Sequence, residues 1–223
     1  MTQQQADAAL MAAADEQYRA FNAKIVRSDL PMWGVRVPAV QKLAKQCAKE
    51  GGDFLDTYRA ENYEQILLYA LTVAYDKRPV ELKYAYIDTV LRLIDNWAHV
   101  DLMLGAFKQL KKCREAFWAH YAHLADGGEF ERRFLAVFLM DYCLCDELLD
   151  DVFATYEKLQ GGQYYVNMAV AWGLSVALVK FYDRTLAFLQ KGTLNSFVFK
   201  KTVQKARESF RISPEQKQQL KSL

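Results

Sequence analysis

Glycine and proline are scarce in this sequence, with ten glycines and four prolines among 223 residues. Tight turns between β-strands draw heavily on these residue types, so the scarcity leaves little room for a β-rich fold. No apolar run approaches the roughly 18–20 uncharged residues that span a bilayer. The first residues also lack a basic region followed by an apolar stretch. We therefore expect neither a membrane-spanning segment nor a secretory leader.

Cysteine and histidine are also sparse. The four cysteines are Cys47, Cys113, Cys143 and Cys145. Their number and irregular spacing do not suit a disulfide framework, which predicts a cytoplasmic location. His120 and His123 lie three apart on a predicted helix but lack the H-E-x-x-H arrangement of a helical zinc site. We expect no metal site.

Three common catalytic signatures are missing as well. The sequence has neither a G-x-x-x-x-G-K-[ST] loop nor a G-x-G-x-x-G loop, so nucleotide phosphates have no visible cradle. The G-x-S-x-G elbow of serine hydrolases is also absent. We therefore expect no nucleotide cofactor, and no cofactor of any other kind.

Helical periodicity, by contrast, runs through the whole chain. The pattern predicts helices over Asp7–Val26, from Pro38 to Gly51, over Asn62–Tyr75, from Pro79, and from about Trp97, Arg114, Phe130, Glu147, Tyr164, Tyr182, Asn195 and Pro214. Short links imply antiparallel neighbours, and helical pairs recur about every 35–40 residues. We predict an all-α fold, a HEAT-like α-solenoid with a concave face that forms one domain over residues 1–223. A compact helical bundle is the alternative.

Charge is unevenly distributed. The net charge is +2, but residues 184–223 hold nine basic and two acidic side chains. Such asymmetry suits a protein that meets a polyanion with one end. A solvated basic terminal helix explains the charge equally well.

Three places combine aromatic and charged residues. Trp97 and Asp101 are spaced to share one helical face, and Arg132-Arg133 opens an otherwise apolar helix. The third is the segment 164–172, which ends in Trp172. Each also has an ordinary explanation, as a core tryptophan, an aspartate near a helix start or arginines on a wet surface.

Taken in order, these motifs resemble a known family. The series is Trp33-Gly34-Val35-Arg36-Val37-Pro38, then Asn96-Trp97 to Asp101, then Arg132-Arg133, then Tyr164-Tyr165-Val166-Asn167-Met168-Ala169-Val170-Ala171-Trp172. From about residue 15 to the C-terminus the chain is similar to the DNA alkylation repair family, the AlkD-like HEAT-repeat alkylpurine DNA glycosylases. The resemblance implies a monomer that holds duplex DNA on a concave basic face. It also implies removal of cationic N3- and N7-alkylpurines without a base-flipping pocket.

The resemblance also implies roles for individual residues. Asp101 matches the catalytic carboxylate, and Trp97 and Trp172 match indoles that flank the damaged nucleotide. Arg133, or less well Arg132, matches a basic residue that holds the lesion strand. The lysines that match phosphate contacts in the last repeat are Lys200, Lys201 and Lys205.

Two features depart from the family pattern. With one helix over Asp7–Val26, the chain lacks the additional short N-terminal helix of active members. Ser175 also stands where relatives tend to place an arginine. Two alternatives to an active glycosylase therefore stay open: a weak or inactive member that binds DNA or a protein, and an unrelated helical scaffold.

Overall fold

The computed structural model describes residues 1–223, and all of its regular elements are helices. The chain divides into two compact units, Met1–Cys113 and Arg114–Leu223, which we call the first and the second unit. The predicted all-α class is confirmed, whereas the solenoid arrangement stays a prediction. None of the helices is both long enough and apolar enough to cross a lipid bilayer.

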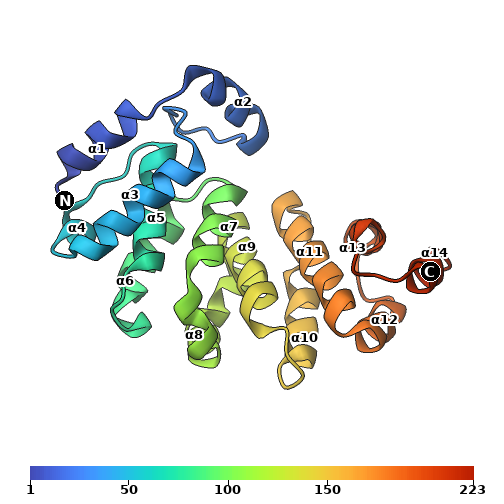
Figure 1. The fold of residues 1–223 in the computed structure, drawn as a ribbon. Coiled ribbons are helices and arrows are strands. Elements are labelled where there is room, and N and C mark those ends of the chain that lie inside the picture. The colour runs from blue at the N-terminus through green and yellow to red at the C-terminus, as the bar shows by residue number, and fades with distance from the viewer. The chain divides into compact units, whose positions relative to one another are not determined.

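The first unit is built around one buried helix. Its elements are α1 (Gln3–Ala12), α2 (Glu16–Val26), α3 (Val37–Glu50), α4 (Phe54–Thr57), α5 (Tyr63–Tyr75), the 3-10 helix η1 (Val80–Lys83), α6 (Tyr84–Leu93), α7 (Trp97–Ala106) and the 3-10 helix η2 (Lys108–Lys112). Helix α5 packs against α3 and α7, and also against α4 and α6 (Figure 1). All of its residues except Tyr75 are buried, so α5 is the core to which α7 is fixed.

The N-terminal segment corrects one expectation. The predicted single helix over Asp7–Val26 is wrong, because α1 and α2 are separate helices. Asp15 ends the run of helix formers: its side chain caps α2 by accepting a hydrogen bond from the Tyr18 amide at 2.9 Å, while its own amide donates to the Gly34 carbonyl at 3.0 Å. The expected lack of an additional N-terminal helix rested on that single helix, so this expectation loses its basis.

A buried carboxylate explains the local structure of the 33–35 segment. Glu64, on α5, is fully buried and accepts hydrogen bonds from the amides of Trp33, Gly34 and Val35 at 2.9, 2.7 and 3.1 Å. A buried charge is tolerated only when such partners compensate its lost hydration. Gly34 has φ +85°, and a Cβ there would lie 2.5 Å from the Asp15 carbonyl. Glu64 thus anchors the chain between α2 and α3.

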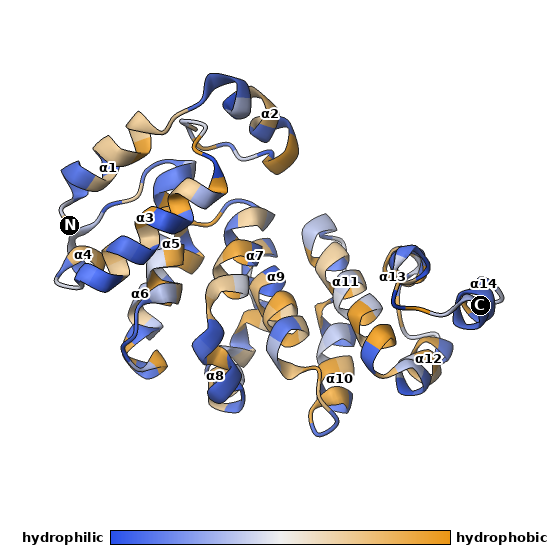
Figure 2. Ribbon diagram, viewed as in Figure 1, coloured by the Kyte–Doolittle hydropathy of each residue, from blue (hydrophilic) through white to orange (hydrophobic).

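The second unit repeats this plan around α11. Its elements are α8 (Arg114–Tyr121), the 3-10 helix η3 (Ala122–Asp126), α9 (Glu129–Phe138), the π-helical turn η4 (Leu139–Cys143), α10 (Leu149–Leu159), α11 (Tyr164–Lys180), α12 (Tyr182–Gln190), α13 (Ser196–Glu208) and α14 (Pro214–Lys221). Helix α11 packs against α9 and α13, and also against α10 and α12. Hydrophilic residues dominate α13 and α14 (Figure 2). Helix α13 therefore covers apolar residues of α11 and presents a polar outer face.

Candidate functional site

Helix α7 of the first unit carries two of the predicted site residues. Trp97 is its first residue, and Asp101 follows one turn later. Both side chains are half-buried. Because residues four apart share a helical face, the indole and the carboxyl project from the same side of α7.

A buried hydrogen-bond network fixes the start of α7. The Asn96 side-chain oxygen accepts hydrogen bonds from the amides of Ala98 and His99, at 2.9 and 3.3 Å, and so caps the helix. The Asn96 amide nitrogen lies 2.9 Å from Nδ1 of His99, and Nε2 of His99 lies 2.9 Å from the Tyr63 carbonyl oxygen. This network ties the first turn of α7 to the first turn of α5.

The chemistry of these partners decides the tautomer of His99. A carbonyl oxygen only accepts, so Nε2 carries the hydrogen, and Nδ1 accepts from the Asn96 amide. Burial of the ring lowers the pKa of His99 from 6.5 to about 4. At neutral pH the ring is therefore uncharged, and it serves as a rigid strut rather than as an acid or base.

The segment after α2 is also tied to α7. One carboxyl oxygen of Asp95 accepts hydrogen bonds from the Ser28 hydroxyl at 2.6 Å and from the Asp29 amide at 3.1 Å. The Trp97 indole nitrogen lies 3.5 Å from the Ile25 carbonyl oxygen. The start of α7, with the Trp97 indole, is thus held by α2 and by the segment that follows α2.

Asp101 borders an open pocket of about 560 Å³ in the first unit. The pocket lies between α3, the end of α5 and the second half of α7. Its lining residues include Lys45, Lys77 and Lys108, which are all exposed, and Asp76, which is buried. Three cations beside one reachable carboxylate would draw a phosphate-bearing ligand toward Asp101. No sequence pattern indicates this pocket, because its lysines come from three segments spread over more than sixty residues.

Arg133, in the second unit, is buried rather than displayed. Only 5% of the residue is exposed, and its guanidinium donates to the Tyr165 carbonyl at 2.8 Å. Arg132 is half-buried and donates to the Gln163 side-chain oxygen at 2.9 Å and to the Leu159 carbonyl. These contacts fasten α9 to the end of α10, to the start of α11 and to the segment between them.

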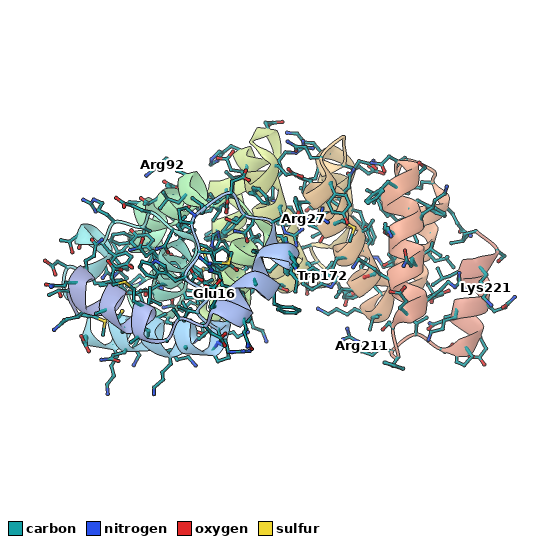
Figure 3. The ribbon with its side chains drawn as sticks, turned by 90° about the horizontal axis from the view of Figure 1, so that it is seen from above. Glu16, Arg27, Arg92, Trp172, Arg211 and Lys221 are labelled. Atoms are coloured by element: carbon teal, nitrogen blue, oxygen red, sulfur yellow. The ribbon has the colours of Figure 1, made fainter.

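Trp172 lies at a second, smaller pocket. The residue is 36% exposed on α11 and borders a hollow of about 280 Å³ together with Ser175, Lys205 and Arg211. The Ser175 hydroxyl donates to the Trp172 carbonyl at 2.7 Å. Figure 3 shows the side chains of Trp172 and Arg211 extending from the ribbon of this unit. The structure thus joins two predicted residues, Trp172 and Lys205, to a cation that sequence reasoning did not single out.

The three predicted lysines of α13 do not line one common pocket. Lys205 borders the Trp172 hollow, whereas Lys200 lines a different pocket of about 730 Å³ between α13 and α14. Lys201 is half-buried, and its ammonium donates to the Gln204 side chain at 2.9 Å. The other cations that line the pocket of Lys200 are Arg207, Lys217 and Lys221. The excess of basic residues over 184–223 was the sequence signal for this cluster, but it could not assign each cation to a pocket.

The chain is similar to one family of known proteins. The sequence model of a family described as DNA alkylation repair enzyme matches residues 6–211 of the chain. A comparison with curated proteins finds no match.

Proposed function

The chain belongs to the DNA alkylation repair enzyme family, and on this premise we propose that it hydrolyses the N-glycosidic bond of cationic N3- and N7-alkylpurines in duplex DNA. Membership gives it a role in DNA repair, with DNA as substrate or partner. The observation that carries the proposal is the position of Asp101. Its carboxyl stands on an anchored helix, on the same side as an indole, and borders a pocket with three lysines.

The proposed reaction needs a negative group more than it needs an acid. An alkylated purine of this kind already carries positive charge, so its bond to C1′ breaks with both electrons leaving on a neutral base. Positive charge then develops on the sugar, and a nearby carboxylate stabilises it by about 3–4 kcal/mol at 4–5 Å and an effective dielectric constant of 20. Asp101 would work ionised.

Water completes the proposed hydrolysis. It attacks C1′ with its oxygen, and Asp101 orients it and accepts the proton that the new hydroxyl group loses. The products are the free base and an abasic sugar. The face of an indole attracts a cation by roughly 0.5–2 kcal/mol, which is the role proposed for Trp97 and Trp172. No base-reading pocket is required, since the lesion supplies its own leaving-group activation.

DNA binding would fall to the cations. Lys45, Lys77 and Lys108 are proposed to draw the backbone toward Asp101, and Lys200, Lys201 and Lys205 to bind phosphates along α13. Arg133 is proposed to support the lesion strand through the segment that it holds, since its guanidinium is buried. Phosphate contacts of this kind make affinity fall steeply with salt.

The test is base release from methylated duplex DNA. Asp101→Asn keeps the size of the side chain but removes its charge, and we expect release of 7-methylguanine and 3-methyladenine to fall about a hundredfold or more. Asp53→Asn, an exposed aspartate of the first unit, is the matched control and should release base at the wild-type rate. Melting curves of both variants check that the fold is intact.

The outcomes separate the hypotheses. Release by Asp101→Asn at the wild-type rate would refute the proposed role of this carboxylate. No release by the wild-type protein, together with salt-sensitive binding of duplex, would instead indicate a member of the family that binds DNA without cleaving it.

A further inference from the structure

The segment between α13 and α14 displays the most exposed large apolar residue of the chain. Phe210 is fully exposed, with its two neighbours Ser209 and Arg211 bordering the hollow beside Trp172. A phenylalanine ring left in water forgoes the stabilisation that burial would bring. Folding therefore does not account for its position.

The segment that carries Phe210 is anchored at both ends. Ile212 is buried, and Ser213 caps α14 by accepting a hydrogen bond from the Gln216 amide at 3.2 Å. On the other side of the ring, the Arg211 amide donates to the Ser209 hydroxyl at 3.2 Å. The ring is thus held outward by a fixed turn and is not carried on a loose tail.

Charge next to the ring indicates the chemistry of its partner. Lys205 and Arg211 border the adjoining hollow, where Glu208 is the one acidic residue. An aromatic ring stacks on a flat group, while a guanidinium and an ammonium bind phosphate oxygens. Phe210 stands in the chain between Ser209 and Arg211, which both line this hollow. A nucleotide likewise joins a flat base to a phosphate.

We propose that Phe210 is a base-stacking residue that binds an unpaired nucleotide of DNA, while Arg211 and Lys205 hold the phosphate next to it. The proposal rests on the proposed function only in taking DNA as the ligand, and it does not require base release. The base must be unpaired because both faces of a base in closed duplex are covered by its neighbours. Separating them costs a few kcal/mol per step.

The consequence is a preference among DNA structures. Duplex with a short single-stranded gap offers free base faces, so the protein should bind it more tightly than the same duplex without a gap. The preference should depend on the ring and not on the cations, because gapped and closed DNA carry similar phosphates. The cations should instead set the salt dependence for both.

The experiment compares fluorescence anisotropy titrations of gapped and closed duplexes of one sequence. Phe210→Ala should lose about tenfold in affinity for gapped duplex and less than twofold for closed duplex. Phe210→Trp should keep the preference, because an indole also stacks. Leu82→Ala removes an apolar side chain that is 65% exposed in the first unit, and it is the matched control that should leave the preference unchanged.

A second pair of variants tests the cations. Arg211→Ala should weaken binding of both DNAs about threefold and lower the slope of log affinity against log salt by roughly 0.9. Lys191→Ala, an exposed cation outside the hollow, is the control and should change neither quantity as much.

Two results would overturn the proposal: equal wild-type affinity for gapped and closed duplex, or an unchanged preference in Phe210→Ala. A wild-type protein that discriminates gapped DNA but releases no base would refute the proposed function and support this site. Base release without discrimination would do the reverse.

Discussion

The two units are built on one plan but use their polar side chains differently. In the first unit the buried polar side chains form hydrogen bonds that fix the backbone. Glu64 accepts from three amides, and Asn96 and His99 link α7 to α5. In the second unit most basic side chains of α13 and α14 stay at the surface, where Lys200 and Lys205 line separate pockets. The first unit uses buried hydrogen bonds to fix α7, the helix that carries Asp101, whereas α13 and α14 of the second unit display basic side chains at surface pockets.

Under the proposed function, this difference suits what each kind of group would do. A carboxylate that stabilises a developing charge must be held at a fixed distance, which costs buried hydrogen bonds around its helix. A cation that binds phosphate gains from long-range attraction and loses little by moving. In the first unit we expect substitutions of buried polar residues to lower the free energy of unfolding most. In the second unit we expect the largest losses at tightly packed positions.

The largest expected effect is at Glu64. Glu64→Ala leaves three backbone amides without an acceptor, and we expect the free energy of unfolding to fall by about 4 kcal/mol. Denaturant unfolding monitored by circular dichroism measures the loss. Glu61→Ala, which removes an exposed carboxylate three residues earlier, should change it by less than about 0.5 kcal/mol. Equal effects of the two variants would contradict the anchoring role of Glu64.

The next effect is at Gly173, beside Trp172 on α11. A Cβ there would lie 2.1 Å from the Tyr156 hydroxyl, which is buried and donates to the Ala136 carbonyl at 3.2 Å. We expect Gly173→Ala to destabilise the protein by about 2–3 kcal/mol through overpacking. The comparison is Gly105→Ala on α7, where a Cβ meets no atom within 4 Å. That variant should stabilise by up to about 1 kcal/mol in the same unfolding experiment. Changes of opposite sign in the free energy of unfolding would support the comparison. A stabilising effect of Gly173→Ala would contradict it.

The smallest of the three is a dependence on pH. Burial lowers the pKa of His99 to about 4, below its value of 6.5 in the unfolded chain, so the unfolded state binds more protons between these pH values. Stability should fall as pH drops below about 6.5, with a loss of about 2 kcal/mol between pH 7 and pH 5. Denaturant titrations at the two pH values measure it. His99→Gln should show a shallower dependence, and an equal one would assign the effect to other groups.

Much of the fold could be predicted from periodicity and capping. The helix predicted over Asn62–Tyr75 is α5, with Asn62 as its cap, and Gly51 ends α3 as expected. The helix after Pro79 shows where this stops. Leu82 is apolar yet exposed, whereas Lys83 is buried and its ammonium donates to the Val73 and Asp76 carbonyls at 3.2 and 2.5 Å. Burial lowers the pKa of Lys83 to about 8. Carbonyls left at the end of α5 outweigh periodicity there, and no local pattern reveals them.

The candidate site was predictable in its residue types but not in its surroundings. The spacing of Trp97 and Asp101 placed them on one face, as found. Arg133 looked like a surface residue, but the Tyr165 carbonyl that receives it lies 32 positions away in sequence. The pockets beside Asp101 and Trp172 arise from packing between helices, which a linear pattern does not specify.

The double role of Asn96 has a consequence for substitution. Aspartate and asparagine are normally interchangeable at the N-cap of a helix, because both offer a side-chain oxygen to the free amides of the first turn. Asn96→Asp would preserve that oxygen yet replace the amide group that faces Nδ1 of His99 with a second acceptor. Two lone pairs would then meet in a dry interior unless the imidazole took up a proton, which burial opposes. A replacement of one NH₂ by one oxygen, conservative on any exchange table, would here be among the costly ones.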